Sequence, residues 1–183
     1  EYIFGRKLNF IDLSNFSFAE KISMIFEIMI SVETLHINGF IHREIGPFNI
    51  MIDYRKSAVL VGLSSSKFLE FSIPLTINLG GTGFIAPEQN KTNEYSFPAD
   101  VFSIGKVMYY IINEAGQSVI SKKNKWLDAL YNQCIEKDQY KRPNIASLIN
   151  KFFHLLSTNF KSIIQNEIVK NTLNNIYEIR LKE

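Results

Sequence analysis

The side chains best suited to chemistry gather in one short segment, residues 42–49, which reads H-R-E-I-G-P-F-N. It brings together an imidazole, a carboxylate and an amide at His42, Glu44 and Asn49. Such groups can transfer protons, and their oxygens can contact a metal ion. Each also has a structural reading. A lone histidine is more often part of a core, Glu44 could be a solvated surface acid, and Asn49 could cap local backbone.

The composition narrows the class of protein. Of the 183 residues, 46% are hydrophobic and 21% are charged, which is typical of one soluble globular domain with or without an appendage. The net charge of +2 is too small to indicate a nucleic-acid partner or an anionic membrane. The single cysteine, Cys134, excludes an intrachain disulfide and a four-cysteine zinc site. No apolar run approaches the ~18 residues of a membrane span, so we expect a cytoplasmic protein without membrane insertion.

Two elements are predicted to position the segment. Ser17 and Glu20 have the spacing of a capping box, and apolar residues then follow at helical spacing as far as Gly39, which predicts a helix before the segment. Behind it, the short apolar runs 49–52 and 58–61 are separated by a polar stretch. This pattern predicts a small β-hairpin.

The rest of the chain is predicted to be mostly helical. No periodicity holds over residues 62–88, which indicates a long ordered loop, and such loops are usually functional. A buried helix is predicted over about 98–114, and two more over 125–136 and 144–156. The tail, 157–183, is predicted to be a helical extension that either docks on the domain or binds a partner. The fold class is therefore mainly α, a helical bundle with a small β-hairpin.

Four motifs, in the same order, resemble those of the eukaryotic protein kinases. Residues 42–49 resemble the catalytic loop H-R-D-L-x-x-x-N. Residues 81–88, G-T-G-F-I-A-P-E, resemble the end of the activation segment. Residues 99–105, A-D-V-F-S-I-G, resemble the start of the family's central helix, and 141–143, K-R-P, its arginine-proline motif. The resemblance is closest to serine/threonine and tyrosine-kinase-like members.

The resemblance implies a protein-kinase-like C-terminal lobe over residues 1–156, followed by the helical extension. Residues 1–8 resemble the hinge that follows the family's small lobe, so we expect the small lobe to be absent from this chain. Residues 42–49 would then be the catalytic loop, and 62–88 the activation segment.

The departures from the family pattern fall where its chemistry lies. Glu44 stands where the family has an aspartate that accepts the substrate hydroxyl's proton, and Gly46 stands where serine/threonine kinases place a lysine. Asn49, which would hold one magnesium ion, is retained. Gly62 aligns with the aspartate of the D-F-G motif, and no acidic residue occurs anywhere in 54–69. The resemblance therefore implies the loss of a metal-binding carboxylate.

The residues that hold the family's fold together are retained. In the family, the counterparts of Glu88 and Arg142 form an ion pair, and that of Asp100 hydrogen-bonds the catalytic-loop backbone. The resemblance makes His42 structural, and Arg43 able to bind a phosphate on the activation segment.

Three functions stay open on these observations. The favoured one is a catalytically inactive pseudokinase that acts as an interaction or regulatory module with protein partners and no cofactor. The alternative is a divergent serine/threonine protein kinase, with weak phosphotransfer when joined to its small lobe. It would bind ATP at the hinge residues Glu1, Tyr2 and Ile3, and Mg²⁺ through Asn49, with Glu44 as the base. The third is a degenerate product without a selected role.

Overall fold

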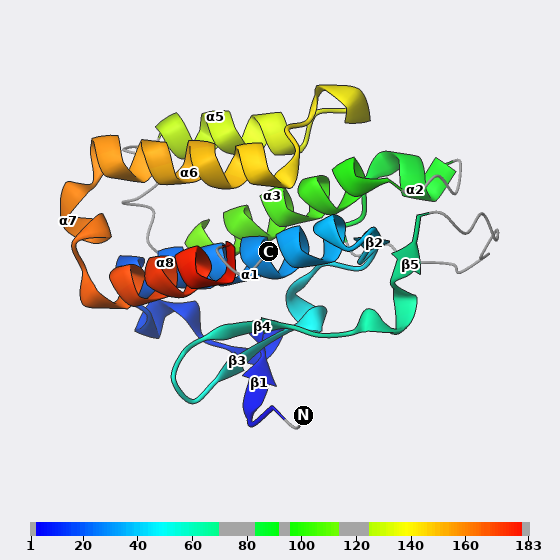
Figure 1. Ribbon diagram of the computed structural model, residues 1–183. Helices are drawn as coiled ribbons and strands as arrows, with labels where there is room; N and C mark the ends of the chain where they lie inside the picture. The colour runs from blue at the N-terminus through cyan, green and yellow to red at the C-terminus, as the bar shows by residue number, and fades with distance from the viewer. Residues whose placement is uncertain (1–2, 70–82, 92–95, 114–124, 181–183) are drawn as a thin grey trace.

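The computed structural model describes residues 3–69, 83–91, 96–113 and 125–180 (Figure 1). One long helix lies at the centre, with further helices on one side of it and a small sheet on the other. The helices are α1 (Phe18–Ile37), α2 (Pro87–Lys91), α3 (Phe97–Asn113), α5 (Lys125–Cys134), α6 (Ile145–Asn159), α7 (Lys161–Ile164) and α8 (Glu167–Arg180). None in the described part of the chain is long and apolar enough to cross a membrane.

The central helix α1 begins and ends as predicted. The Ser17 hydroxyl accepts a hydrogen bond from the Glu20 backbone N–H at 3.2 Å, and the Glu20 carboxylate accepts one from the Ser17 N–H at 2.7 Å. At the other end, Gly39 has a φ of 78°, the left-handed conformation that ends a helix. The predicted capping box and helix are thus confirmed.

The core forms where α1 packs against α3, α6, α8 and strand β4. Phe26 of α1 meets Phe152 of α6 edge-on, with ring centroids 4.9 Å apart, and both rings are fully buried. On the far side, α3 and α5 approach closely at Gly105, where a Cβ would lie 2.5 Å from the Cβ of Cys134. The glycine therefore permits the close helix packing.

The sheet is larger than the predicted hairpin. β3 (Ile50–Asp53) and β4 (Ala58–Leu60) form that hairpin, with Ile50 opposite Leu60, and β1 (Gly5–Lys7) adds a third antiparallel strand on β3. A separate antiparallel pair joins β2 (Phe40–Ile41) to β5 (Lys67–Phe68). Both additions arise from pairing between residues far apart in sequence, which local patterns do not reveal.

The predicted loop over 62–88 contains short elements where it is described. A 3₁₀ turn η4 (Leu63–Ser65) and the two-residue strand β5 occupy its start, and α2 begins at its end. Residues 70–82 lie outside the described residues. Further 3₁₀ turns are η1 (Leu8–Phe10), η2 (Leu13–Asn15), η3 (Pro47–Asn49) and η5 (Gln139–Lys141).

The tail forms two helices, α7 and α8, and docks on the domain. α8 lies against α1, and Val169 on it is fully buried. Of the two readings left open for the tail, docking on the domain is the one that the structure displays.

Candidate functional site

Asp100 is the buried carboxylate that fixes the backbone of segment 42–49. It stands in the first turn of α3 and accepts hydrogen bonds from the backbone N–H groups of His42 at 2.8 Å and Arg43 at 2.9 Å. Its Oδ2 also lies 2.9 Å from Nε2 of His36, near the end of α1. A carboxylate can be buried when such donors replace water. Asp100 therefore joins α1, α3 and the segment.

The His42 ring is neutral and structural. The residue is fully buried, and its Nδ1 accepts a hydrogen bond from the Glu44 backbone N–H at 3.3 Å. Nε2 then carries the proton and donates to the Val61 carbonyl at 2.9 Å. Burial lowers the pKa of His42, which favours the same neutral form. The ring joins the segment to the chain just after β4.

Arg43 is buried beside the segment, with a left-handed backbone at φ 77°. Its Nη1 donates to the Ser65 carbonyl at 3.1 Å. The Arg43 carbonyl accepts from Gln89 Nε2 at 3.2 Å, and Gln89 Oε1 in turn accepts from the Ala86 N–H at 3.2 Å. These bonds tie the segment to α2. Phosphate binding by Arg43 stays a prediction, because residues 70–82 of the predicted activation segment lie outside the described residues.

Glu44 and Asn49 are brought together by a side-chain hydrogen bond. Asn49 Nδ2 donates to the Glu44 carbonyl at 2.9 Å, so its amide does cap local backbone. The half-buried Glu44 carboxylate accepts a hydrogen bond from Ser65 Oγ at 2.7 Å. Sequence reasoning misses Ser65, because its neighbours Ser64 and Ser66 give no sign of which hydroxyl turns inward. The roles of Glu44 as base and Asn49 as metal contact stay predictions.

Gly62 occupies a position that only glycine fits without displacing its neighbour. Its backbone is left-handed, with φ 83° and ψ 37°. A Cβ built there would lie 2.6 Å from Oδ1 and 2.7 Å from Cγ of Asn49. The backbone N–H of the preceding residue, Val61, donates a hydrogen bond to the Asn49 carbonyl at 2.9 Å. This bond holds the two segments of the chain next to each other. The Asn49 side chain thus occupies the space that a side chain at 62 needs.

Gly46 is different, because its surroundings accept a side chain. Its backbone is extended, with φ −174°, a conformation that any residue adopts. A Cβ there would meet the Phe84 side chain at 3.7 Å, an ordinary van der Waals distance. The lack of a lysine at this position is therefore not imposed by packing.

The oxygen donors of this region do not fit a magnesium ion. Within the described ranges there is no cluster of three or more His, Cys, Asp or Glu side chains that could hold a metal. Glu44 already accepts a bond from Ser65, and Gly62 brings no side-chain oxygen. The expected nucleotide contacts at Glu1 and Tyr2 lie outside the described residues, and Ile3 is half-buried.

Glu88 and Arg142 form an ion pair that is largely buried. Two parallel bonds join them, Nη1 to Oε1 at 2.5 Å and Nη2 to Oε2 at 2.9 Å. The guanidinium also donates to the carbonyls of Pro98 at 3.1 Å and Glu136 at 2.8 Å, and lies 5.0 Å from the Phe102 ring centre. The pair therefore links α2 to α3 and to the connection between α5 and α6.

Curated relatives of this chain are named as protein kinases. It is 30% identical over 124 residues to a hormonally up-regulated neu tumor-associated kinase homolog of Xenopus laevis, covering 66% of this chain and 20% of the relative. It is 28% identical over 106 residues to a probable LIM domain-containing serine/threonine-protein kinase of Dictyostelium discoideum, covering 58% and 16%. A serine/threonine-protein kinase of Toxoplasma gondii is 25% identical over 123 residues, covering 67% and 19%.

The matched region spans at most a fifth of the length of these three relatives. The family model of the protein kinase domain matches residues 1–166, which is most of the chain and includes Asp100 and the pair of Glu88 with Arg142. The chain therefore belongs to the protein kinase domain family.

Proposed function

We propose that this chain belongs to a catalytically inactive pseudokinase that acts by binding protein partners. The observation that carries the proposal is the pairing of Gly62 with Asn49. Glycine at 62 supplies no carboxylate where the resemblance places the metal-binding aspartate, and its left-handed backbone lies directly beside the Asn49 side chain. Kinases need divalent ions that bridge and neutralise the β- and γ-phosphate oxygens. Loss of that ligand removes the largest electrostatic aid to transfer.

The surroundings of Glu44 support the same proposal. A glutamate at the base position is one methylene longer than aspartate, and a displacement of about 1 Å can cost about a hundredfold in rate. The Ser65 hydroxyl occupies one of its oxygens at 2.7 Å. Gly46 offers no ammonium group to a γ-phosphate, although its backbone has space for a side chain. Three features of phosphate handling are thus altered within one loop region.

The retained frame favours a folded module over a degenerate product. Asp100 accepts two backbone hydrogen bonds, and Arg142 makes two bonds to Glu88 while being almost fully buried. Loss of one partner from such a buried pair costs about 3–5 kcal/mol. A chain under no selection for folding would not be expected to retain all of these charged residues together with their partners.

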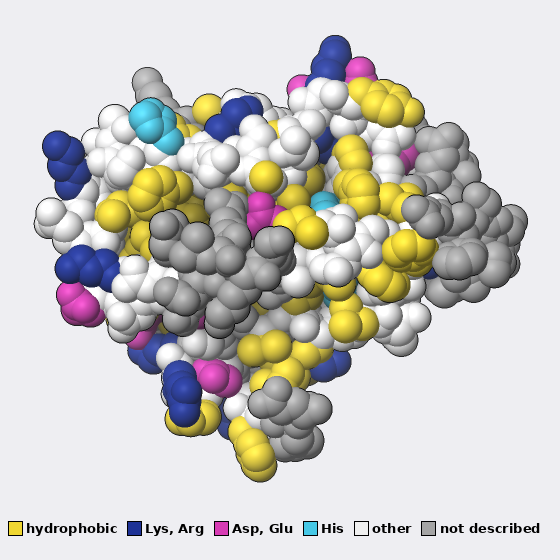
Figure 2. Space-filling model, in the orientation of Figure 1, with side chains coloured by type: hydrophobic (Ala, Val, Ile, Leu, Met, Phe, Trp, Pro, Cys, Tyr) yellow, Lys and Arg dark blue, Asp and Glu magenta, His cyan; other side chains and the backbone are white. Residues whose placement is uncertain are grey.

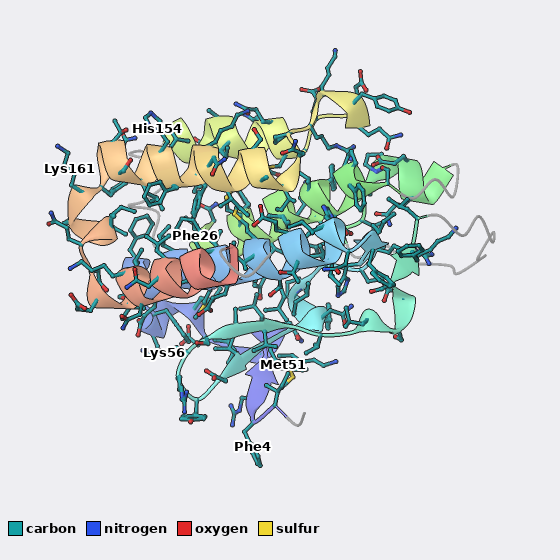
Figure 3. All side chains as sticks on the ribbon, viewed as in Figure 1. Phe4, Phe26, Met51, Lys56, His154 and Lys161 are labelled. Carbon is teal, nitrogen blue, oxygen red and sulfur yellow. The ribbon has the colours of Figure 1, made fainter. Side chains whose placement is uncertain are left out.

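Exposed apolar side chains offer surface for a protein partner. Phe4 is 74% exposed, Phe48 is 51% exposed and Leu63 is 54% exposed. Phe4 projects from the lower end of the molecule, at β1 (Figure 3), and Figure 2 shows apolar side chains on that part of the surface. Exposed apolar surface can serve as an interaction site in proteins.

The test is a phosphotransfer assay on the full-length natural protein with ATP and Mg²⁺. We expect turnover far below about 1 s⁻¹, the lower end for kinases, and the same residual signal in Glu44→Gln. Turnover near that value, abolished by Glu44→Gln, would overturn the proposal. A catalytically active kinase assayed in parallel controls for the substrate and the metal.

The alternative is a divergent serine/threonine kinase that uses Glu44 as its base. It is favoured by the acidic side chain at 44 and by the bond that links Asn49 to the same loop. It predicts magnesium-dependent stabilisation by ATP, about 2.7 kcal/mol at a hundred times the dissociation constant. A thermal-shift titration of the full-length protein, with and without Mg²⁺, separates the two functions, because the inactive module predicts no magnesium-dependent shift.

A further inference from the structure

A cavity of about 380 Å³ lies between α1, the turn that joins β3 to β4, and α8. Each element presents one stripe of side chains to it. Glu20, Ser23 and Glu27 face it from successive turns of α1, and Asn171 and Thr172 face it from α8. None of its lining residues belongs to segment 42–49 or to residues 62–65, so it is separate from the candidate site.

The cavity exists because the tail docks on the kinase lobe. The Ser23 and Thr172 hydroxyls share a buried hydrogen bond, and the neighbouring Val169 is fully buried against the core. α8 begins at Glu167, immediately after the region matched by the family model. One wall is therefore built by residues beyond that region.

The charges around the cavity are unevenly paired. Lys56, on the turn, extends toward α1 (Figure 3), where its ammonium lies 2.6 Å from a Glu20 oxygen and 5.0 Å from the Phe16 ring centre. Arg55 turns toward Tyr54, donating from Nε to its hydroxyl at 2.8 Å, with the guanidinium 5.2 Å from the ring centre. Both bases line the same cavity as Glu27, but neither forms an ion pair with it.

Neither of these bases neutralises the carboxylate of Glu27. One of its oxygens accepts the Ala58 backbone N–H at 2.6 Å, and no Lys, Arg or His of the described chain pairs with it. Burial raises the pKa of Glu27 to about 7, and the negative charge of Asp53 adds to this, while hydrogen bonds from Ala58 and Ser57 act in the opposite direction. A partly buried carboxylate that faces a polar cavity and has no ion-pair partner among the described residues favours a positively charged ligand.

We propose that this cavity binds a small aliphatic primary amine, with its ammonium group on the Glu27 carboxylate. An ammonium group has three donors. Beside Glu27, the Ser23 and Thr172 hydroxyls and the Asn171 side chain offer oxygens on the cavity wall, and Ile168 supplies apolar surface for the carbon chain. The volume exceeds that of a single ammonium group and suits a chain of a few carbons. The proposal is independent of whether the kinase site is active.

The experiment is a calorimetric titration of the complete chain with n-butylamine at pH 8 and pH 6, beside sodium butyrate as an anion of matched size. We expect saturable binding of the amine and none of butyrate. Affinity should be about tenfold lower at pH 6, because a carboxyl with a pKa near 7 is about nine-tenths ionised at pH 8 and about one-tenth at pH 6. Glu20, Lys56, Arg55 and Asp53 are the other charged groups near Glu27 in this region.

Two variants test the assignment to Glu27. Glu27→Gln keeps an acceptor for the Ala58 N–H and removes the charge, so amine affinity should fall at least tenfold at pH 8. Glu167→Gln removes an exposed carboxylate that pairs with Lys170 on α8, and should bind as the wild type does. Absence of saturable amine binding, equal binding of butyrate, or unchanged affinity in Glu27→Gln overturns the proposal. The wild-type pH comparison decides the matter even where a variant fails to fold.

Discussion

Replacing Gly62 with alanine tests whether the space beside Asn49 is closed. The left-handed backbone at φ 83° costs an ordinary L-residue about 1–2 kcal/mol. The new methyl would lie 2.6 Å from Asn49 Oδ1, so the amide must rotate and give up its bond to the Glu44 carbonyl, which is worth about 1 kcal/mol. Gly62→Ala should therefore lower the free energy of unfolding by about 2–3 kcal/mol.

A double-mutant cycle separates the two contributions. Asn49→Ala alone loses the same hydrogen bond and should cost about 1 kcal/mol. In the Asn49→Ala background the methyl at 62 meets open space, so only the backbone cost of about 1–2 kcal/mol remains. Because the hydrogen bond to the Glu44 carbonyl can be lost only once, the double variant should be about 1 kcal/mol more stable than the sum of the two single costs predicts.

The assay is urea unfolding followed by circular dichroism, with the midpoint compared at unchanged slope. A Gly62→Ala cost below about 0.5 kcal/mol, or the same cost in both backgrounds, would show that the pocket can relax. In that case a metal-binding carboxylate could have been kept at 62, and the steric support for an inactive site would be lost.

Three further predictions follow from the same structure. Arg142→Met removes the cation of the ion pair with Glu88 and should cost about 3–5 kcal/mol, measured by urea unfolding; a cost below about 1 kcal/mol would contradict the buried ion pair. Gly46→Lys should leave stability within about 0.5 kcal/mol of the wild type, because its Cβ has ordinary contacts; a large drop in melting temperature would refute that reading. The pKa of Glu27 rises from 4.5 to about 7 on folding, so the folded state binds this proton more tightly. Its contribution to the free energy of unfolding, at most about 3 kcal/mol, is complete below pH 4.5 and is lost as the pH rises to about 7. Unfolding curves of Glu27→Gln should lack this loss. The same pH profile in Glu27→Gln and the wild type would count against the buried carboxyl.

Local patterns predicted the helices well because each boundary depends on neighbours in sequence. The capping box of Ser17 and Glu20 needs only three residues, and the apolar periodicity of α1 and α3 needs only one buried face. Asn144, one residue before α6, likewise caps that helix, because its side-chain oxygen accepts a hydrogen bond from the Ser147 backbone N–H at 2.8 Å. The hairpin of β3 and β4 was predicted for the same reason, since its turn is short.

The parts that escaped prediction depend on contacts across long stretches of chain. β1 is recognisable only when Gly5 lies opposite Asp53, and Ser65 matters only because it reaches Glu44 from twenty-one residues away. The cavity at Glu27 requires Thr172 to meet Ser23, a separation of 149 residues. Composition and spacing do not reveal such long-range contacts. The polar residues at 20, 23 and 27 on an otherwise buried helix did, however, indicate that another polar element packs against that face.

The carboxylates of this kinase domain differ in what their loss would cost the fold. Asp100 accepts hydrogen bonds from two backbone N–H groups, and Glu88 accepts two from the Arg142 guanidinium, so removing either carboxylate would take an acceptor from buried donors. The aspartate that the resemblance implies at 62 would instead have served a metal ion and a nucleotide. Folding stability therefore keeps Asp100 and Glu88 under selection whether or not phosphate is transferred, whereas only catalysis would keep an aspartate at 62. A kinase-domain chain that keeps Asp100 and Glu88 but has glycine at 62 is what the proposed partner-binding, inactive function predicts.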